Sequence, residues 1–136
     1  MTLIEVVIAL AITGLMLGGI ISGYIYCTTA AMKAELVQAA SARALERLEE
    51  TRSAQWNTAV YPVVDQLVAA NFSNVVVSLD TPGTNLTGTA ATIVTTISQI
   101  SSNPPIRNIR VDCIWQFRRT TDWVTNTFET IRAPDQ

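Results

Sequence analysis

The sequence predicts an α+β fold in which a long N-terminal α-helix packs on a small antiparallel β-sheet of about four strands. The chain has no charged side chain before Lys33 except Glu5, so its start is one long apolar segment. From residue 28 to residue 53, apolar residues recur at three- and four-residue spacing, which is typical of an amphipathic helix. Segment 108–117 alternates apolar and polar residues, as a half-buried strand does. We therefore divide the 136 residues into a hydrophobic helix, its amphipathic continuation and a globular β head, with the bounds 1–27, 28–53 and 54–136.

The first segment, 1–27, is long and apolar enough for a membrane-spanning helix, which needs about 20 apolar residues. Glu5 interrupts this segment, and a carboxylate in hydrocarbon is unfavourable unless it finds a partner. The nearest cation is the amino group of Met1, either in the same chain or in a neighbouring copy. Because the first turn of a helix directs that amine away from the fifth side chain of its own chain, we expect Glu5 to pair with a neighbour's Met1.

Four glycines in this helix form two G-x-x-x-G spacings: Gly14 with Gly18, and Gly19 with Gly23. Each glycine in a helix interior is less favourable than alanine by about 1 kcal/mol. The spacing suits close contact between two helices in lipid. The alternative interpretation is that membrane helices carry additional glycine without any special role.

The second segment is predicted to be one-sided, with an apolar stripe made of Ala34, Val37, Ser41, Ala44, Leu45 and Leu48. Arg43 with Glu46, and Arg47 with Glu50, are spaced to form ion pairs worth a few tenths of a kcal/mol each. At 1.5 Å per residue, ~53 helical residues make a rod of roughly 80 Å. A domain of this size has no core of that length, so we expect the first half to protrude and to be buried in lipid or against other copies.

In the head, Pro62 predicts the first turn of a short helix that ends near Asn71. An exposed loop, 84–91, is expected after a turn at Asp80–Gly83. Four strands are predicted, at 74–79, 92–98, 108–117 and 123–131. The third strand places Ile109, Val111, Cys113, Trp115 and Phe117 on one face, and the fourth places Val124, Asn126, Phe128 and Thr130 on one face.

The composition argues against an enzyme, a metal site or a bound cofactor. The chain has no histidine, and its two cysteines cannot form a four-thiolate zinc site. Its acidic residues are scattered, and no glycine-rich phosphate-binding loop follows a strand. The net charge of −2 does not suggest a nucleic-acid partner, because proteins that bind nucleic acid usually have a clustered basic face.

The cysteines and arginines leave alternatives open. We expect Cys27 and Cys113 to be unpaired and buried, since a bridge requires Cα atoms within about 7 Å. The alternative is a disulfide, if the sheet covers the helix from its first turn outside the membrane.

The one local basic cluster consists of Arg107, Arg110, Arg118 and Arg119. It is either a solvated strand edge, balanced by Asp112, Asp122 and Glu129, or a surface that contacts the next subunit or binds DNA weakly.

The opening MTLIEVVIALAI resembles the mature amino terminus of the type IV pilin superfamily, which comprises type IV pilins and the pseudopilins of type II secretion and competence. The family pattern is an aliphatic opening, a glutamate five residues into the mature chain and an unbroken apolar helix, and residues 1–27 match it. Most members begin with Phe, and Met1 departs from this as a minority does. In the family, a membrane-embedded prepilin peptidase removes a basic leader and methylates the new terminus. The resemblance therefore implies a processed chain with a methylated Met1 and with Glu5 as its docking partner.

The resemblance also implies a pilin fold and the role of structural subunit in a type IV pilus-like filament. Copies would lie as single-pass proteins in the bacterial inner membrane and would then stack helically into an extracellular filament, with apolar rods inside and β heads outside. The implied partners are other copies, other pilins, the prepilin peptidase, the inner-membrane assembly platform and, before assembly, membrane lipid. Many members have a proline where this chain has Ser22, so we expect the glycines alone to allow local melting between Gly14 and Gly23 in the filament.

Two other functional classes remain open. The run RALERLE, 43–49, after a Met1-type opening resembles some minor pseudopilins, which prime or cap a secretion or DNA-uptake pseudopilus at low copy number. The other class is a membrane-anchored enzyme or binding protein. A plain membrane anchor would not need Glu5 and usually carries a basic flank. A signal peptide has a basic start and a shorter apolar core, so the first segment fits neither pattern.

Overall fold

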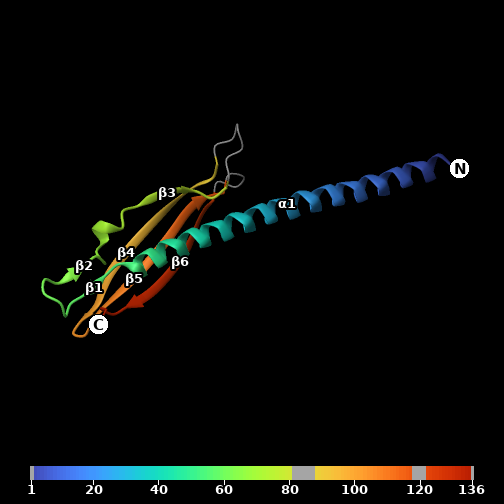
Figure 1. Ribbon diagram of the computed structural model, residues 1–136. Helices are drawn as coiled ribbons and strands as arrows, with labels where there is room; N and C mark the ends of the chain where they lie inside the picture. The colour runs from blue at the N-terminus through green and yellow to red at the C-terminus, as the bar shows by residue number, and fades with distance from the viewer. Residues whose placement is uncertain (1, 81–87, 118–121, 136) are drawn as a thin grey trace. The chain divides into compact units, whose positions relative to one another are not determined.

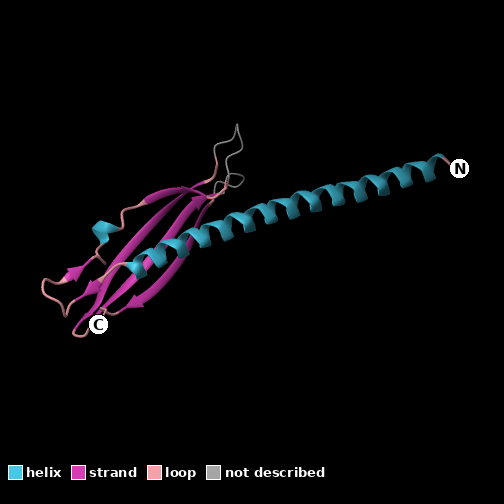
Figure 2. Ribbon diagram, viewed as in Figure 1, coloured by secondary structure: helices cyan, strands magenta, loops and turns pink. Residues whose placement is uncertain are grey.

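The computed structural model describes residues 2–80, 88–117 and 122–135, and its fold is α+β (Figures 1 and 2). A long N-terminal helix precedes two antiparallel sheets, one of two strands and one of four. In chain order the elements are α1 (Leu3–Ser53), β1 (Trp56–Asn57), β2 (Val64–Asp65), the 3₁₀ turn η1 (Ala69–Asn71), β3 (Val75–Ser78), β4 (Ala90–Ser102), β5 (Pro105–Gln116) and β6 (Trp123–Arg132). The predicted fold class is confirmed.

The chain divides into two compact units, Met1–Glu35 and Leu36–Gln136. The first unit holds the apolar part of α1, and every described side chain from residue 2 to residue 27 is exposed in it. The second unit, which we call the head, holds the remaining turns of α1 and all the strands.

The four-stranded sheet of the head has the order β3-β4-β5-β6, and all neighbouring strands are antiparallel. Figure 2 shows the three long strands side by side. A β-bulge between Gln99 and Ser101 shifts the register of β4 against β5, whereas β5 and β6 pair without interruption from Arg107↔Arg132 to Gln116↔Trp123. The long strands thus form one regular platform whose last strand is β6.

The core lies between this platform and residues 36–53 of α1. Ala40, Ala44 and Leu48 are buried on the helix at four-residue spacing, and the five residues predicted to share one face of β5 are all buried. The buried indole of Trp115 donates a hydrogen bond to Asn126, at 3.1 Å between Nε1 and Oδ1. The amide of Asn126 then donates to Ser41 Oγ at 3.0 Å, so a polar link inside the core fixes the sheet to the helix.

The predicted helix stripe is wrong at two positions. Ala34 and Leu45 are exposed, whereas Ala40, which we had not placed on the stripe, is fully buried. The observed stripe is narrow, because the buried residues Ala40, Ala44 and Leu48 lie in a single line along the helix. Leu45, one residue and about 100° around the helix from Ala44, therefore lies outside it.

The short helix predicted from Pro62 to Asn71 is also wrong, since this segment holds the two-residue strand β2 and the turn η1. Tertiary hydrogen bonds take the backbone groups that a helix would need. The N–H of Gln66 donates to the carbonyl of Gln55 at 2.8 Å, and the carbonyl of Leu67 accepts from Arg107 at 2.7 Å. The buried Leu67 side chain anchors the same segment in the core.

Both cysteines are free, as predicted. Cys113 is buried in the head, and burial raises the pKa of its thiol. Cys27 is exposed, so the expectation that both thiols are buried is wrong for this one. Its neighbours on α1 leave the side chain uncovered because the apolar part of the helix has no second layer within its own unit.

Candidate functional site

The most unusual surface of the molecule is the uncovered apolar part of α1. Large side chains are exposed on all sides of this helix, for example Leu3 at 85%, Leu15 at 78% and Ile20 at 68%. Among the described residues, α1 is the one helix that is long and apolar enough to cross a membrane, as judged by length and composition. A contiguous apolar surface of this extent marks an interaction with lipid or protein.

Glu5 has a partner within its own chain. Its Oε2 accepts a hydrogen bond from the backbone N–H of Thr2 at 2.9 Å, and Thr2 immediately precedes the first helical residue, Leu3. This is one half of a capping box, and a carboxylate in the first turn also complements the positive end of the helix dipole. Met1 lies outside the described residues, so the predicted pairing of Glu5 with a Met1 amine stays a prediction.

The sequence already contained this cap, because T-x-x-E ahead of an apolar run is the pattern of a capping box. Our interpretation considered only a positive charge as the partner of Glu5. The single hydrogen bond from Thr2 uses Oε2, and a carboxylate has acceptor capacity for further donors. Capping and pairing with a neighbour's amine are therefore compatible.

The four glycines lie in uninterrupted helix, and apart from the adjoining residues and the nearby helix backbone no atom lies within 4 Å of a methyl group added at any of them. Within the chain, then, no packing requires glycine at these positions. Gly14 and Gly19 are five residues apart, which corresponds to about 140° around a helix, so the two G-x-x-x-G pairs open different faces. The predicted melting concerns the filament and stays a prediction.

The predicted arginine cluster does not form one patch among the described residues. Arg107 and Arg110 are three positions apart on β5, and successive side chains of a strand point to opposite faces. Arg110 is half exposed beside Asp112, at 2.9 Å, and Glu129, at 3.8 Å, so the predicted balance by acidic residues is confirmed for this arginine. The predicted strand edge is wrong for it, because β5 lies between β4 and β6. Arg118 and Arg119 lie outside the described residues.

Arg107 forms an anchor that sequence reasoning missed. Its guanidinium donates two hydrogen bonds to the carboxylate of Asp65, at 2.7 and 2.6 Å, and lies 4.4 Å from the ring centroid of Trp56. These hydrogen bonds hold the pKa of Asp65 below its usual value, against the opposing effect of partial burial. Asp65 and Arg107 are 42 residues apart, so no local pattern in the sequence signals the pair. The anchor ties the irregular segment after β1 to the sheet.

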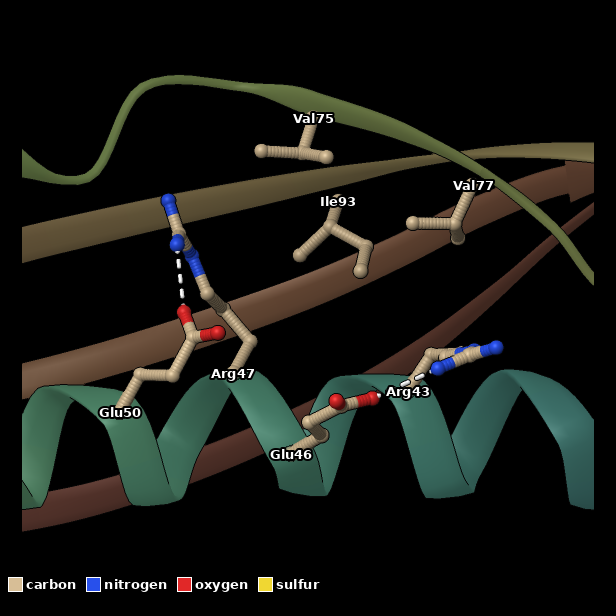
Figure 3. Close-up of a pocket in the computed structure, with 7 residues that line it drawn as sticks. All are labelled: Arg43, Glu46, Arg47, Glu50, Val75, Val77 and Ile93. Carbon is tan, nitrogen blue, oxygen red and sulfur yellow. Dashed lines mark hydrogen bonds and ion pairs between the residues drawn. The ribbon is translucent and has the colours of Figure 1, made fainter.

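The groove between α1 and the first two strands of the sheet is a weak candidate for a binding site (Figure 3). Its volume of about 150 Å³ is well below the 300–1,000 Å³ typical of ligand pockets. Val75, Val77 and Ile93 form its apolar wall, and its four charged side chains are paired with each other, Arg43 with Glu46 and Arg47 with Glu50. The charged side chains of the groove are therefore already paired with each other.

In the part of the chain that the structure describes, no three His, Cys, Asp or Glu side chains are grouped so that they could hold a metal ion. Comparison with known proteins gives no match: no protein-family model, no curated protein and no solved structure matches the chain. The uncovered apolar part of α1 and its capped Glu5 are therefore the features that point to a function.

Proposed function

We propose that the chain is a structural subunit of a type IV pilus-like extracellular filament, which assembles through the apolar part of α1. The observation that supports this most directly is the exposure of large apolar side chains all round the helix from Leu3 to Tyr26. Apolar surface in water is unfavourable by about 25 cal/mol per Å², so this helix requires lipid or other copies around it. A single-pass position in a bacterial inner membrane before assembly, and the core of a filament afterwards, supply these two environments.

In this proposal, Glu5 sets the register between neighbouring subunits. The carboxylate keeps its hydrogen bond from Thr2 and receives the Met1 amine of the next copy on its remaining acceptor sites. Inside an apolar filament core, a charged group without a partner is strongly unfavourable, so only the register that pairs Glu5 is stable. Methylation of Met1 and removal of a leader would fall to a prepilin peptidase, and extraction from the membrane to an assembly platform.

The glycines fit an array in which each helix has several neighbours. The pairs Gly14/Gly18 and Gly19/Gly23 open two faces about 140° apart, so one helix can be approached closely from two sides. A dimer would need one such face, whereas a helical stack uses at least two. We propose no enzymatic activity and no cofactor for this subunit.

The experiment is to replace Glu5 in the producing cells by alanine and, separately, by glutamine. Glu5→Gln can still accept the hydrogen bond from Thr2 but lacks the charge, so the two variants separate capping from charge pairing. Loss of a desolvated charge pair is worth several kcal/mol, so both variants should reduce filament yield in the sheared surface fraction at least about tenfold. Glu35→Ala, which removes an exposed glutamate from the same helix, is the matched control and should leave the yield unchanged.

Membrane insertion should be intact in both Glu5 variants, because removal of a carboxylate makes the segment more apolar. Abundant normal filaments in Glu5→Ala would contradict the proposal, and normal filaments in Glu5→Gln alone would reduce Glu5 to a helix cap. If the unmodified chain stays at low copy in the membrane while the fibres consist of another protein, the priming or capping pseudopilin becomes the better interpretation.

A further inference from the structure

Strand β6 has the features of an interface edge. It is an end strand of the four-stranded sheet, ten residues long, and pairs with β5 without a bulge. It contains neither proline nor glycine. Proteins usually protect such an edge by shortening, bulging, charging or covering it, because its unpaired backbone groups can bind another strand.

The register identifies the residues that face the free edge. The N–H of Phe117 donates to the carbonyl of Asp122 at 3.1 Å, which extends the β5–β6 register by one pair. In an antiparallel ladder, hydrogen-bonded and non-hydrogen-bonded pairs alternate. The even-numbered residues of β6 therefore bond to β5, and the odd-numbered residues direct their backbone groups away from it: Trp123, Thr125, Thr127, Glu129 and Ile131.

These five residues are nearly symmetric about Thr127. The two large apolar side chains, Trp123 at 70% exposure and Ile131 at 67%, lie four residues on either side of it. We propose that β6 pairs antiparallel with β6 of a second copy of this chain, with Thr127 facing Thr127 across a two-fold axis. Trp123 of each copy then lies opposite Ile131 of the other, a pairing of an aromatic with a β-branched residue that stabilises sheets.

The sheet surface beside each of these side chains is hollowed. A hollow of about 530 Å³ is lined by Ile131 together with Asn108 and Ile100, and one of about 300 Å³ is lined by Trp123 together with Gln116 and Ala90. In the proposed pairing, the larger hollow lies next to the incoming indole and the smaller one next to the incoming isoleucine. The larger side chain thus meets the larger of the two hollows.

Neighbouring registers fit less well. A shift that lets Thr125 face Thr127 places Trp123 opposite Glu129 and leaves Ile131 without a partner strand. The opposite shift places Ile131 against Thr125 and leaves Trp123 unpaired. With Thr127 on the axis, Glu129 faces Thr125, no like charges meet, and Arg110 stays within 3.8 Å of Glu129 in its own chain.

Such a contact is isologous and closes on itself, so it joins two copies and does not by itself build a filament. It uses only residues of the head and does not depend on the proposed role of Glu5. The contact and the filament can therefore be tested separately.

The test is disulfide trapping of the full-length protein in detergent micelles, with Cys27→Ser as background and with Cys113 left buried. Facing residues in a hydrogen-bonded pair have Cα atoms about 5.5 Å apart, which is within the range of a disulfide. Thr127→Cys should therefore form a disulfide-linked dimer under mild oxidation. In the matched control, Thr125→Cys, the two thiols are separated by four residues, or about 14 Å along the strand, and should link at least about tenfold more slowly.

A mixture of differently tagged Thr125→Cys and Glu129→Cys chains should give mixed dimers that neither chain gives alone. Because Thr127 also donates a hydrogen bond to Asp112 at 2.6 Å, tryptophan fluorescence is used to confirm that Thr127→Cys is folded. When both the Thr125→Cys chain and the Glu129→Cys chain also carry Thr127→Lys, the yield of mixed dimers should fall at least about fivefold, because two like charges then face each other directly. Equal linking at Thr127 and Thr125, or mixed dimers that are unaffected by Thr127→Lys, would overturn the proposal.

Discussion

The two units of the chain use apolar residues in opposite ways. In the head, Ile109 has no exposed surface, whereas Ile20 of the first unit is 68% exposed. The head carries a second layer for its apolar face, because the turns of α1 from residue 36 onward cover β4 to β6 with Ala40, Ala44 and Leu48. The first unit has no second layer of its own. The apolar content of a segment therefore does not predict a core unless another part of the chain covers that segment.

Polar groups show the reverse contrast. In the first unit, the hydroxyls of Thr13 and Thr28 donate to carbonyls of their own helix, at 2.8 and 3.0 Å, so the helix satisfies its polar side chains locally. That is the requirement for a helix surrounded by hydrocarbon. The head instead satisfies its polar groups over long range, as between Asn126 and Ser41. The first unit thus holds these threonine hydroxyls within its own helix but leaves its large apolar side chains exposed.

The strongest test of this comparison truncates the same residue type in each unit. Ile109→Ala removes a buried side chain from the platform and should lower the free energy of unfolding of the head by about 2–5 kcal/mol. Ile20→Ala removes an exposed side chain and should change it by less than about 0.5 kcal/mol. Urea unfolding of the full chain in micelles can be followed by tryptophan fluorescence, since all three tryptophans lie in the head.

The two outcomes must differ for the comparison to hold. A loss of equal size in both variants would mean that Ile20 is covered within the chain after all. In the filament assay, by contrast, Ile20→Ala should reduce the filament yield more than Glu35→Ala does, because the Ile20 side chain lies on the proposed assembly surface.

The next test concerns the ion pair that anchors the head. Asp65→Asn removes the charge that faces Arg107 and one of the two carboxylate acceptors, while the Leu67 carbonyl and the Trp56 ring remain beside the guanidinium. Hydrogen bonds to charged groups contribute about 1.5–3 kcal/mol, and the variant should be destabilised by about that amount at pH 7. Glu46→Gln, which breaks the exposed Arg43–Glu46 pair, is the matched control and should change stability by less than about 0.5 kcal/mol.

The same variant has a predicted signature in pH. The pKa of Asp65 is lower in the folded head than in the unfolded chain, where it is about 3.9, so its stabilisation is complete above that value. As the pH falls through the folded pKa, the stabilisation is lost, and Asp65→Asn should therefore lose less stability than the unmodified chain between pH 7 and pH 3. Some pH dependence should remain, because the Trp56 N–H and Arg132 also lower the pKa of Asp135. An identical pH profile in both proteins would show that Asp65 carries no such stabilisation.

The parts of the fold that the sequence predicted are those determined by local periodicity. The alternation from Ile109 to Phe117 specified one buried face of β5, and the uninterrupted apolar run specified the start of α1. Where long-range contacts decide the structure, the prediction failed. The segment after Pro62 has helical spacing, but Arg107, far along the chain, binds both Asp65 and the Leu67 carbonyl and holds it extended.

The candidate site could be predicted from the sequence only in part. The apolar helix and Glu5 were identified from the sequence, whereas the hydrogen bond from Thr2 was missed although its pattern was present. The free edge of β6 could not be anticipated in the same way, because strand order and the phase of the β5–β6 ladder follow from pairing and not from composition. Its symmetry about Thr127 becomes meaningful only once that phase is known.

The smallest expected effect distinguishes two arginines that the sequence treats alike. Arg43 and Arg47 each form an ion pair with the glutamate three residues on, at 2.8 and 2.6 Å, but their side chains are 49% and 14% exposed. Arg47 also donates to the Ser73 carbonyl at 2.9 Å and lies 5.2 Å from the ring centroid of Phe72, so the segment before β3 covers it, whereas Arg43 is half exposed. Arg47→Met, which keeps much of the apolar stem, should lower the free energy of unfolding by about 1 kcal/mol, and Arg43→Met by less than about 0.5 kcal/mol.

Urea midpoints measured in 0.05 and 0.5 M salt should show a larger relative effect of salt on the Arg43 pair, because screening acts mainly on exposed charges. If both variants lose the same stability, coverage by the chain does not distinguish these two arginines, and the contrast between covered and uncovered surfaces holds for apolar side chains only.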